Sequence, residues 1–152
     1  MIVPDINLLL YAYDADSPSH PKASAWWQEC LSGEEPVGLA VVVVFGFVRI
    51  ATHARVFEHP MTAAEAAKQV RSWLEQSVTQ ILEPPRDHVE KALSLVETVG
   101  TAGNLVTDAQ IAALGMQYDG VLHTADSHFL RFSALRWFNP LTGARSGRVR
   151  GR

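Results

Sequence analysis

The amino-acid sequence predicts an α/β protein of three layers, with helices on both faces of a central, mostly parallel sheet. Two observations predict this fold class. Short apolar segments with strand propensity alternate with longer segments whose apolar residues recur at helical spacing. Such alternation is typical of parallel strands joined by crossover helices, which bury both faces of the sheet. The length of 152 residues suits one domain, which we expect over residues 1–140.

The N-terminal part of the chain predicts one strand followed by two helices. The strand is expected at residues 2–4, and the apolar residues after it predict a helix over residues 7–13. A second helix should begin after Ser19, whose hydroxyl can cap it, and should end at Gly33. The first strand is therefore expected to lead directly into helices that cover the sheet.

A valine-rich run after Pro36 is the most ambiguous segment. Residues 37–45 have the β-branched composition of a buried strand. Apolar residues continue over 47–52 without a clear turn signal, so the residues themselves leave the end of this strand open.

Capping patterns mark the helices in the rest of the chain. Thr62 and Glu65 form a capping box, Asp87 and Glu90 repeat the pattern, and Thr107 can cap a later helix. Short apolar segments lie between and after these helices, and we expect them to be strands: residues 81–82, 121–124 and 135–138.

Charge is unevenly distributed along the chain. Four of the 13 basic residues, all of them arginine, lie within residues 141–152, which leaves nine basic against 16 acidic residues elsewhere. An acidic body binds nucleic acid poorly unless cations mask its carboxylates or local basic patches contact phosphate. Because Gly, Ser and Arg dominate residues 141–152, we expect them to form a mobile terminal tail rather than such a patch.

Cysteine usage and hydropathy predict a cytoplasmic protein. Cys30 is the single cysteine, so it can form neither an internal disulfide nor a cysteine-based zinc site. The longest apolar run, residues 39–48, is shorter than the roughly 20 residues that a membrane helix needs. The first residues lack the basic start of a signal peptide, and we expect no membrane partner.

Three aspartates are the candidate chemical groups. Asp5 and Asp126 directly follow apolar strands, and Asp108 lies in the first turn of a predicted helix. Because the carboxyl ends of parallel strands meet at one edge of a sheet, the three carboxylates can converge there. Carboxylate oxygens are ligands that suit Mg²⁺ or Mn²⁺. An aspartate in such a position is also a common turn or cap residue, so the prediction rests on all three together.

The surroundings of these aspartates resemble the motifs of the PIN-domain nucleases, in particular the VapC toxins of toxin–antitoxin systems. Residues 2–7, an apolar strand followed by Asp and then Asn, resemble the first acidic motif. Residues 105–113 and 121–129 resemble two later motifs, Asp-Ala followed by an Ile-Ala-Ala helix and Thr-x-Asp-x-x-Phe. The remaining segments that are similar to one VapC subgroup are residues 47–52, 55–57 and 135–140.

The resemblance implies a three-layer PIN-like α/β/α fold and a homodimeric endoribonuclease that depends on Mg²⁺ or Mn²⁺. Its expected substrate is structured RNA such as tRNA or ribosomal RNA, and its expected partner is a small antitoxin encoded beside it. Asp5, Asp108 and Asp126 are the expected catalytic and metal-binding residues. Hydrolysis by an activated water should leave 5′-phosphate and 3′-hydroxyl ends. The resemblance also implies that the valine run becomes helical near Val42.

Further polar residues have supporting roles under this interpretation. Asn7 and Thr124 are expected to orient carboxylates or water, although local turn bonding explains them equally well. Arg49, Arg55 and His128 are candidates for contact with RNA, with ion pairing or no role as the alternatives. Trp26, Trp27 and Trp73 are expected mainly in the core, and because Trp26 and Trp27 are adjacent on one helix, the alternative for one of these two is a dimer or antitoxin surface.

The sequence departs from the PIN pattern at Gly46, where the helix after the second strand usually carries a glutamate. No carboxylate occurs between Glu35 and Glu58 to replace it, and His128 stands where many relatives have a further acid. Three carboxylates balance two divalent cations poorly, so we expect one metal ion held by protein alone. An alternative function follows: a PIN-like module that binds RNA or antitoxin and cleaves weakly or not at all.

Overall fold

A five-stranded parallel sheet with helices on both faces forms the core of the structure, a computed structural model that describes residues 1–100, 103 and 105–147. The strands lie in the order β3-β2-β1-β4-β5, and every adjacent pair is parallel. The predicted α/β class is therefore confirmed. The elements are β1 (Ile2–Pro4), α1 (Ile6–Tyr13), α2 (His20–Ser32), β2 (Val37–Ala40), α3 (Val41–Ala51), α4 (Ala63–Leu74), β3 (Thr79–Leu82), α5 (His88–Val99), α6 (Leu105–Gln117), β4 (Val121–His123), a 3₁₀ helix η1 (Ser127–Arg131) and β5 (Trp137–Phe138).

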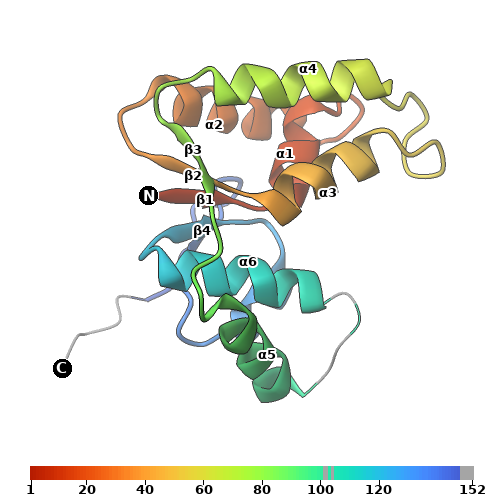
Figure 1. Ribbon diagram of the computed structural model, residues 1–152. Coiled ribbons are helices and arrows are strands. Elements are labelled where there is room, and N and C mark those ends of the chain that lie inside the picture. The colour runs from red at the N-terminus through yellow and green to blue at the C-terminus, as the bar shows by residue number, and fades with distance from the viewer. Residues whose placement is uncertain (101–102, 104, 148–152) are drawn as a thin grey trace.

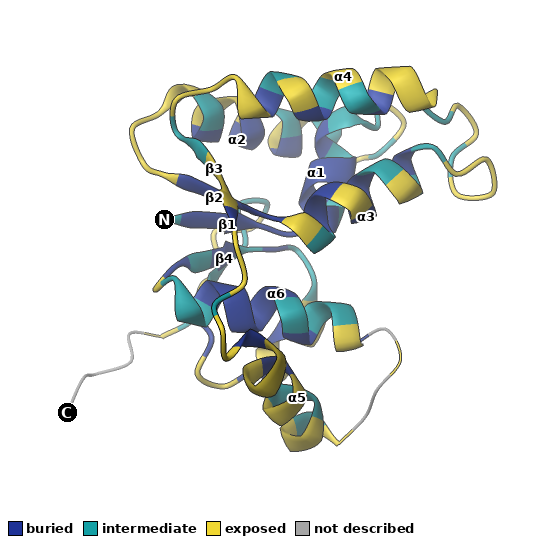
Figure 2. Ribbon diagram, viewed as in Figure 1, coloured by how far each residue is buried: buried dark blue, intermediate teal, exposed yellow. Residues whose placement is uncertain are grey.

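The helices divide into two layers around the sheet. Figure 1 shows α1 to α4 on one side of the strands and α5 with α6 on the other. The two central strands β1 and β2 are buried along their whole length, and Figure 2 shows the buried surfaces of α1, α3 and α6 turned toward them. Because helices cover both faces of the sheet, every residue of these strands is buried, and their sequences are continuously apolar instead of alternating between apolar and polar residues. The strand ends are then the places where polar side chains can reach solvent.

The valine run changes from strand to helix within a few residues. Strand β2 ends at Ala40 and helix α3 starts at Val41, so the strand predicted up to Phe45 from propensity is wrong in its second half. The helical start near Val42, implied by the resemblance, is confirmed. Helical spacing buries Val43 and Phe47 completely on one face, and this burial outweighs the modest helix propensity of valine.

The caps agree only partly with the sequence. The capping box of Thr62 and Glu65 is confirmed, with both reciprocal hydrogen bonds present. Ser19 and Asp87 stand at N-caps, but their side chains make no capping bond. Thr107 is not a cap, because α6 begins two residues earlier at Leu105 and places Thr107 in its first turn.

Trp26 and Trp27 are both buried, which confirms their expected place in the core and corrects the alternative that one of them faces a partner. Their ring centroids lie 5.5 Å apart at an angle of 34°. Trp26 donates a hydrogen bond of 3.0 Å to Nδ1 of His123, and Trp27 packs edge-on against Trp73 at 5.5 Å. Helix α2 packs on α1, and its two tryptophans reach the sheet and α4, so that adjacent side chains are both enclosed.

The residues after β5 fold back along that strand. Arg145 forms an antiparallel bridge with Phe138, and its guanidinium lies 5.3 Å from the centre of the Phe138 ring. Ser146 exchanges backbone and hydroxyl hydrogen bonds with Trp137. The mobile tail was expected over residues 141–152. The structure describes this segment up to residue 147, and Arg148, Arg150 and Arg152 lie outside the described residues.

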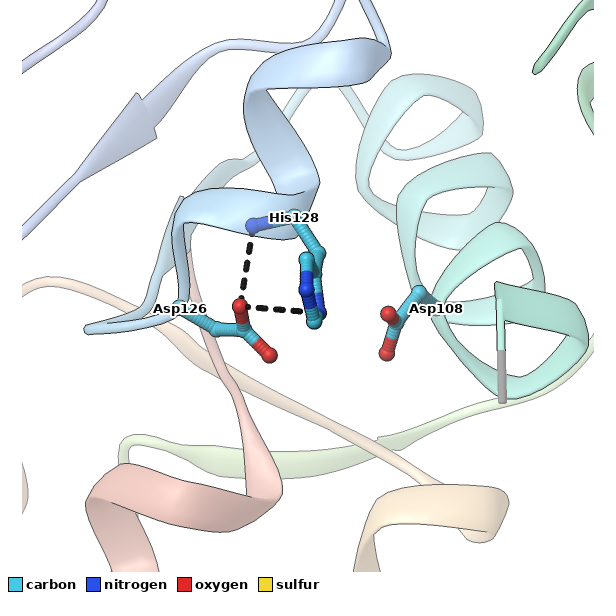
Figure 3. A group of neighbouring side chains, drawn as sticks. All are labelled: Asp108, Asp126 and His128. Carbon is cyan, nitrogen blue, oxygen red and sulfur yellow. Dashed lines mark hydrogen bonds and ion pairs between the residues drawn. The ribbon is translucent and has the colours of Figure 1, made fainter.

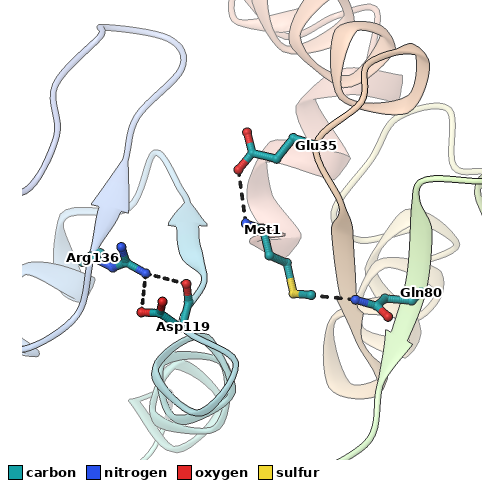
Figure 4. A network of polar contacts seen from close by, with 5 residues as sticks. All are labelled: Met1, Glu35, Gln80, Asp119 and Arg136. Carbon is teal, nitrogen blue, oxygen red and sulfur yellow. Dashed lines mark hydrogen bonds and ion pairs between the residues drawn. The ribbon is translucent and has the colours of Figure 1, made fainter.

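Ion pairs near the amino ends of the strands tie the chain together away from the three aspartates. The N-terminal ammonium of Met1 lies 3.2 Å from Glu35, and Arg136 pairs with Asp119 at 2.6 Å (Figure 4). Each pair joins residues that stand one or two positions before a strand. Within the described part of the chain, no helix is long and apolar enough to span a membrane.

Candidate active site

Asp5 is a buried carboxylate at the junction of β1 and α1. Its backbone N–H donates to the carbonyl of His123, 2.9 Å away on the neighbouring strand, and its Oδ1 accepts from the N–H of Ile6 at 2.7 Å. The side chain is only 4% exposed. Burial is the largest cause that raises the pKa of Asp5 to about 7, and the negative charges of Asp108 and Asp126 raise it further.

Thr124 joins two of the three aspartates. Its buried hydroxyl donates to Oδ2 of Asp5 at 2.9 Å and accepts the backbone N–H of Asp126 at 2.9 Å. Asp5 follows β1 and Thr124 follows β4, and these strands are neighbours in the sheet. The parallel register therefore brings together residues that are 119 positions apart in sequence.

Asp108, Asp126 and His128 form a compact group beside this pair. Each offers one ligand atom, and these atoms all lie within 4.8 Å of one another. Figure 3 shows Asp108 reaching from α6 toward the segment that runs into η1 and carries the other two residues. His128 contacts Asp126 twice, through its backbone N–H at 2.9 Å and through Nδ1 at 3.2 Å.

The electrostatics of this group favour a cation. Partial burial is the main cause that raises the pKa of Asp108 to about 6, the charge of Asp126 raises it further, and His128 opposes the shift. The charges of Asp108 and Asp126 also raise the pKa of Asp5, so the three predicted aspartates interact electrostatically. Partly buried carboxylates that repel one another suit a hard divalent cation such as Mg²⁺ or Mn²⁺, because its charge removes the repulsion and it prefers oxygen ligands.

Comparisons with known proteins agree with this geometry. The PIN-domain family matches residues 2–135. The ribonuclease VapC33 of Mycobacterium tuberculosis is 46% identical over 93% of this chain and 99% of its own length, and ribonuclease VapC37 of that organism is 36% identical over 92% and 97%. This chain is a PIN-domain protein of the VapC ribonuclease family. The resemblance found in the sequence motifs is thereby confirmed.

Solved structures support the PIN fold. The crystal structure of Mycobacterium tuberculosis VapC20, described as a toxin that cleaves the sarcin–ricin loop, has a TM-score of 0.68 and 18% identity, covering 89% of this chain and 96% of that one. VapBC2 of Rickettsia felis, solved with a DNA fragment from its promoter, has a TM-score of 0.65 and 16% identity over 91% and 98%. At these identities the likeness concerns the fold alone.

Gly46 is the position where the sequence predicts that the usual PIN glutamate is missing. A Cβ atom at position 46 would lie 2.5 Å from Cδ1 of Ile6, far inside van der Waals contact. Ile6 directly follows Asp5, so the absent side chain is replaced by the isoleucine of the neighbouring helix. A glutamate could not be inserted here without movement of Ile6.

A groove of about 570 Å³ lies beside the aspartates, between α3 and the start of α6. Its lining includes Gly46 and Arg49 from α3, and Thr107 and Gln110, which flank Asp108. Arg49 is exposed in the last turn of α3. The groove therefore carries one exposed arginine, Arg49, and reaches Ile6 and Thr107, the direct neighbours of Asp5 and Asp108, but none of the three aspartates lines it.

The other predicted residues divide between the site and its surroundings. Thr124 lies inside the site, and His128, for which a loop position without a role was the main alternative, belongs to the group that could hold a metal. Asn7 is half-buried on α1, and its side chain makes no hydrogen bond within the described residues. Arg55 is exposed in the turn after α3 and lies outside the groove. The position of His128, two residues after Asp126, is the sequence signal that was undervalued.

Proposed function

We propose that this VapC-type toxin hydrolyses phosphodiester bonds in structured RNA, such as tRNA or ribosomal RNA, at Asp5, Asp108 and Asp126 with Mg²⁺ or Mn²⁺. The observation that carries the proposal is the compact group of Asp108, Asp126 and His128, with Asp5 linked to the backbone of Asp126 through the hydroxyl of Thr124. Their mutual repulsion is a cost in the free protein that a divalent cation would relieve. His128 is a fourth candidate ligand.

A divalent cation bound here would supply positive charge to the phosphate and make a water molecule more acidic. The chain's own residues do the positioning. The N–H of Ile6 and the hydroxyl of Thr124 fix the two oxygens of Asp5, and the same hydroxyl holds the backbone of Asp126. His128 restrains the Asp126 carboxylate from the other side. Attack by water leaves 5′-phosphate and 3′-hydroxyl ends.

RNA is expected to approach along the groove between α3 and α6. Arg49 can contact a phosphate there, and Arg55 extends the cationic surface past the end of α3. The remaining body is acidic, so these local cations and the metal ion together offset repulsion of the RNA backbone.

We further propose a homodimer and a small antitoxin partner in the cytoplasm. Helices α3 and α5 expose apolar side chains that a monomer would leave in water, with Phe45 at 67%, Val89 at 69% and Leu93 at 52% exposure. Two copies that cover these side chains would bury an apolar surface. Solved relatives of this fold include VapBC complexes, which supports an antitoxin that inhibits the site.

Cleavage of tRNA and ribosomal RNA by the purified full-length protein tests the proposed function. Cutting should require Mg²⁺ or Mn²⁺, should stop with EDTA, and should be lost in Asp108→Asn, whose side chain is nearly the same size. The new 5′ ends should be substrates for a 5′-phosphate-dependent exonuclease. RNA binding without cutting under any metal would support the alternative of a binding module, and 2′,3′-cyclic phosphate ends would exclude the proposed chemistry.

A further inference from the structure

A second hollow borders the acidic cluster on the side of η1 and β5. It has a volume of about 190 Å³, and Thr124 and Asp126 form the wall that it shares with the cluster. Its other walls are Ser127 and Leu130 from η1, Trp137 from β5 and Asn139 from the turn that follows. Any group that fills this hollow is therefore in direct contact with the site of phosphodiester hydrolysis.

The lining of the hollow is uncharged except for Asp126. Leu130 is 56% exposed, and Trp137 is half-buried, whereas Trp26, Trp27 and Trp73 are enclosed in the core. A neutral wall with an accessible indole fits a flat, uncharged group rather than a phosphate. Unpaired nucleobases are such groups, and proteins bind them by stacking on aromatic side chains.

Asn139 gives this wall a defined polarity. Its Oδ1 accepts the backbone N–H of Leu141 at 2.9 Å, which identifies that atom as the oxygen because an N–H can only donate to an acceptor. The amide NH₂ consequently remains as a pair of donors. Donors beside an aromatic wall match the carbonyl and ring-nitrogen acceptors on a base edge.

The main-chain turn after Asn139 also carries a cation. Lys22 on α2 donates to the carbonyl of Leu141 at 3.2 Å and remains exposed. An ammonium has three donors, so two remain for a phosphate near this turn.

We propose that the hollow lined by Leu130, Trp137 and Asn139 binds an unstacked nucleobase next to the scissile phosphate, and that Trp137 and Asn139 determine its identity. This inference rests on the proposed function, since it places the base beside Asp126. RNA that is continuously paired cannot deliver a base to the hollow. The preferred substrates are therefore single-stranded loops within structured RNA.

The first experiment measures cleavage of a pool of RNA hairpins with randomised loops in Mg²⁺ or Mn²⁺. Wild-type protein should prefer certain bases at one nucleotide flanking the cut. Trp137→Leu should raise KM about 10-fold, which corresponds to loss of one stacked base, whereas Trp137→Phe should keep part of the effect. Asn139→Asp retains the oxygen that accepts from Leu141 but loses the NH₂ donors, and it should change the preferred base at that nucleotide.

Controls separate this proposal from the proposed function and from loss of folding. Leu130→Ser should weaken the preference, and Leu74→Ser, a similarly exposed leucine at the end of α4, should not. Thermal melts of each variant exclude unfolding as the cause. Absence of cutting by wild-type protein contradicts the proposed function, whereas normal cutting with unchanged base preference and KM in Trp137→Leu contradicts the base-binding hollow alone.

A second experiment needs no catalysis. Of the four tryptophans, Trp137 should supply the emission that iodide can quench, because the other three are buried. In the Asp108→Asn background, binding of an eight-nucleotide single-stranded RNA should quench this iodide-accessible emission. Trp137→Phe should abolish this quenching. If Trp137→Leu instead weakens binding of the antitoxin at least 10-fold and leaves RNA quenching and base preference unaltered, the hollow binds protein and the proposal is wrong.

Discussion

Cδ1 of Ile6 occupies the space that a side chain at position 46 would need, 2.5 Å from the site of its Cβ. Ile6 is the first residue of α1 and follows its N-cap, Asp5, whereas Gly46 lies in the middle of α3. The glycine predicted to replace the usual PIN glutamate is thus matched by a bulky residue on the facing helix.

This pairing predicts that the two positions are energetically coupled. Gly46→Ala should destabilise the protein by about 1–2 kcal/mol, because Cδ1 of Ile6 must move away from the added methyl toward the groove that both residues line. In the Ile6→Val background, which deletes Cδ1, the same substitution should cost at least about 1 kcal/mol less. Urea unfolding of the four proteins gives the coupling energy, and equal costs in both backgrounds would contradict the packing relation.

Loss of the Thr124 hydroxyl should reduce both RNA cleavage and stability. Thr124→Val keeps the shape but removes the donor to Asp5 and the acceptor for Asp126, so RNA cleavage should fall about 10–100-fold. Stability should fall by about 1–3 kcal/mol, or roughly 2–12 °C in Tm. Thr124→Ser restores the hydroxyl and should recover most activity. A serine variant as inactive as the valine variant would show that the methyl group, not the hydroxyl, matters.

The pKa of Asp5 predicts how stability depends on pH in EDTA. Its folded-state pKa is about 7, above the usual 3.8, so the folded protein binds a proton between these values that the unfolded chain does not. The Asp5 carboxylate therefore costs most stability above pH 7, and this cost disappears as the pH falls toward 4. The gain in Tm of Asp5→Asn over wild type should be larger at pH 8 than at pH 5. A difference that is constant over this range would contradict it.

Metal binding should stabilise the free protein through a single tight ion. Three aspartates with His128 provide too little negative charge for two divalent cations without RNA phosphate. Titration calorimetry with Mn²⁺ should give about one ion per chain, and Asp108→Asn should weaken its binding at least 10-fold. Mn²⁺ should also raise the Tm of wild type more than that of the variant. Two tight ions per chain in the absence of RNA would disprove this stoichiometry.

The exposed apolar side chains of α3 and α5 predict the oligomeric state. Leu93→Glu places a charge on the proposed dimer surface, outside the groove that Phe45 also lines, and should convert the protein to a monomer by light scattering. Leu74→Glu on α4 lies outside that surface and should leave the dimer intact. A wild-type protein that is monomeric at micromolar concentration would remove the basis for this interface.

The sequence predicted the strand–helix alternation well because both faces of the sheet are covered, which leaves each strand as a short apolar run. It could not place the boundary at Ala40, since valine favours strands and only the burial of Val43 and Phe47 against neighbouring helices makes the segment helical. The core placement of Trp26 and Trp27 is confirmed, and the alternative of a partner surface for one of them is wrong, because a helix with neighbours on several sides can bury adjacent side chains.

The convergence of the aspartates followed from general rules, but the detail of the site did not. Each strand end could be placed at one edge of the sheet from the parallel order alone. Whether the hydroxyl of Thr124 bridges two acids, and whether His128 joins them, depends on rotamers and loop paths that no local pattern specifies. The position of Trp137 in a hollow beside this edge likewise depends on the turn that carries Asn139.

The bridge between Arg145 and Phe138 has a consequence for association of this protein with other chains. An unpaired outer strand offers a row of N–H and C=O groups to any extended peptide, and the return of the chain along β5 occupies those groups. Strand β3 forms the opposite margin of the sheet, with Gln80 and Ile81 open to solvent. A polypeptide that binds by adding a strand would therefore attach along β3, on the far side of the molecule from Trp137.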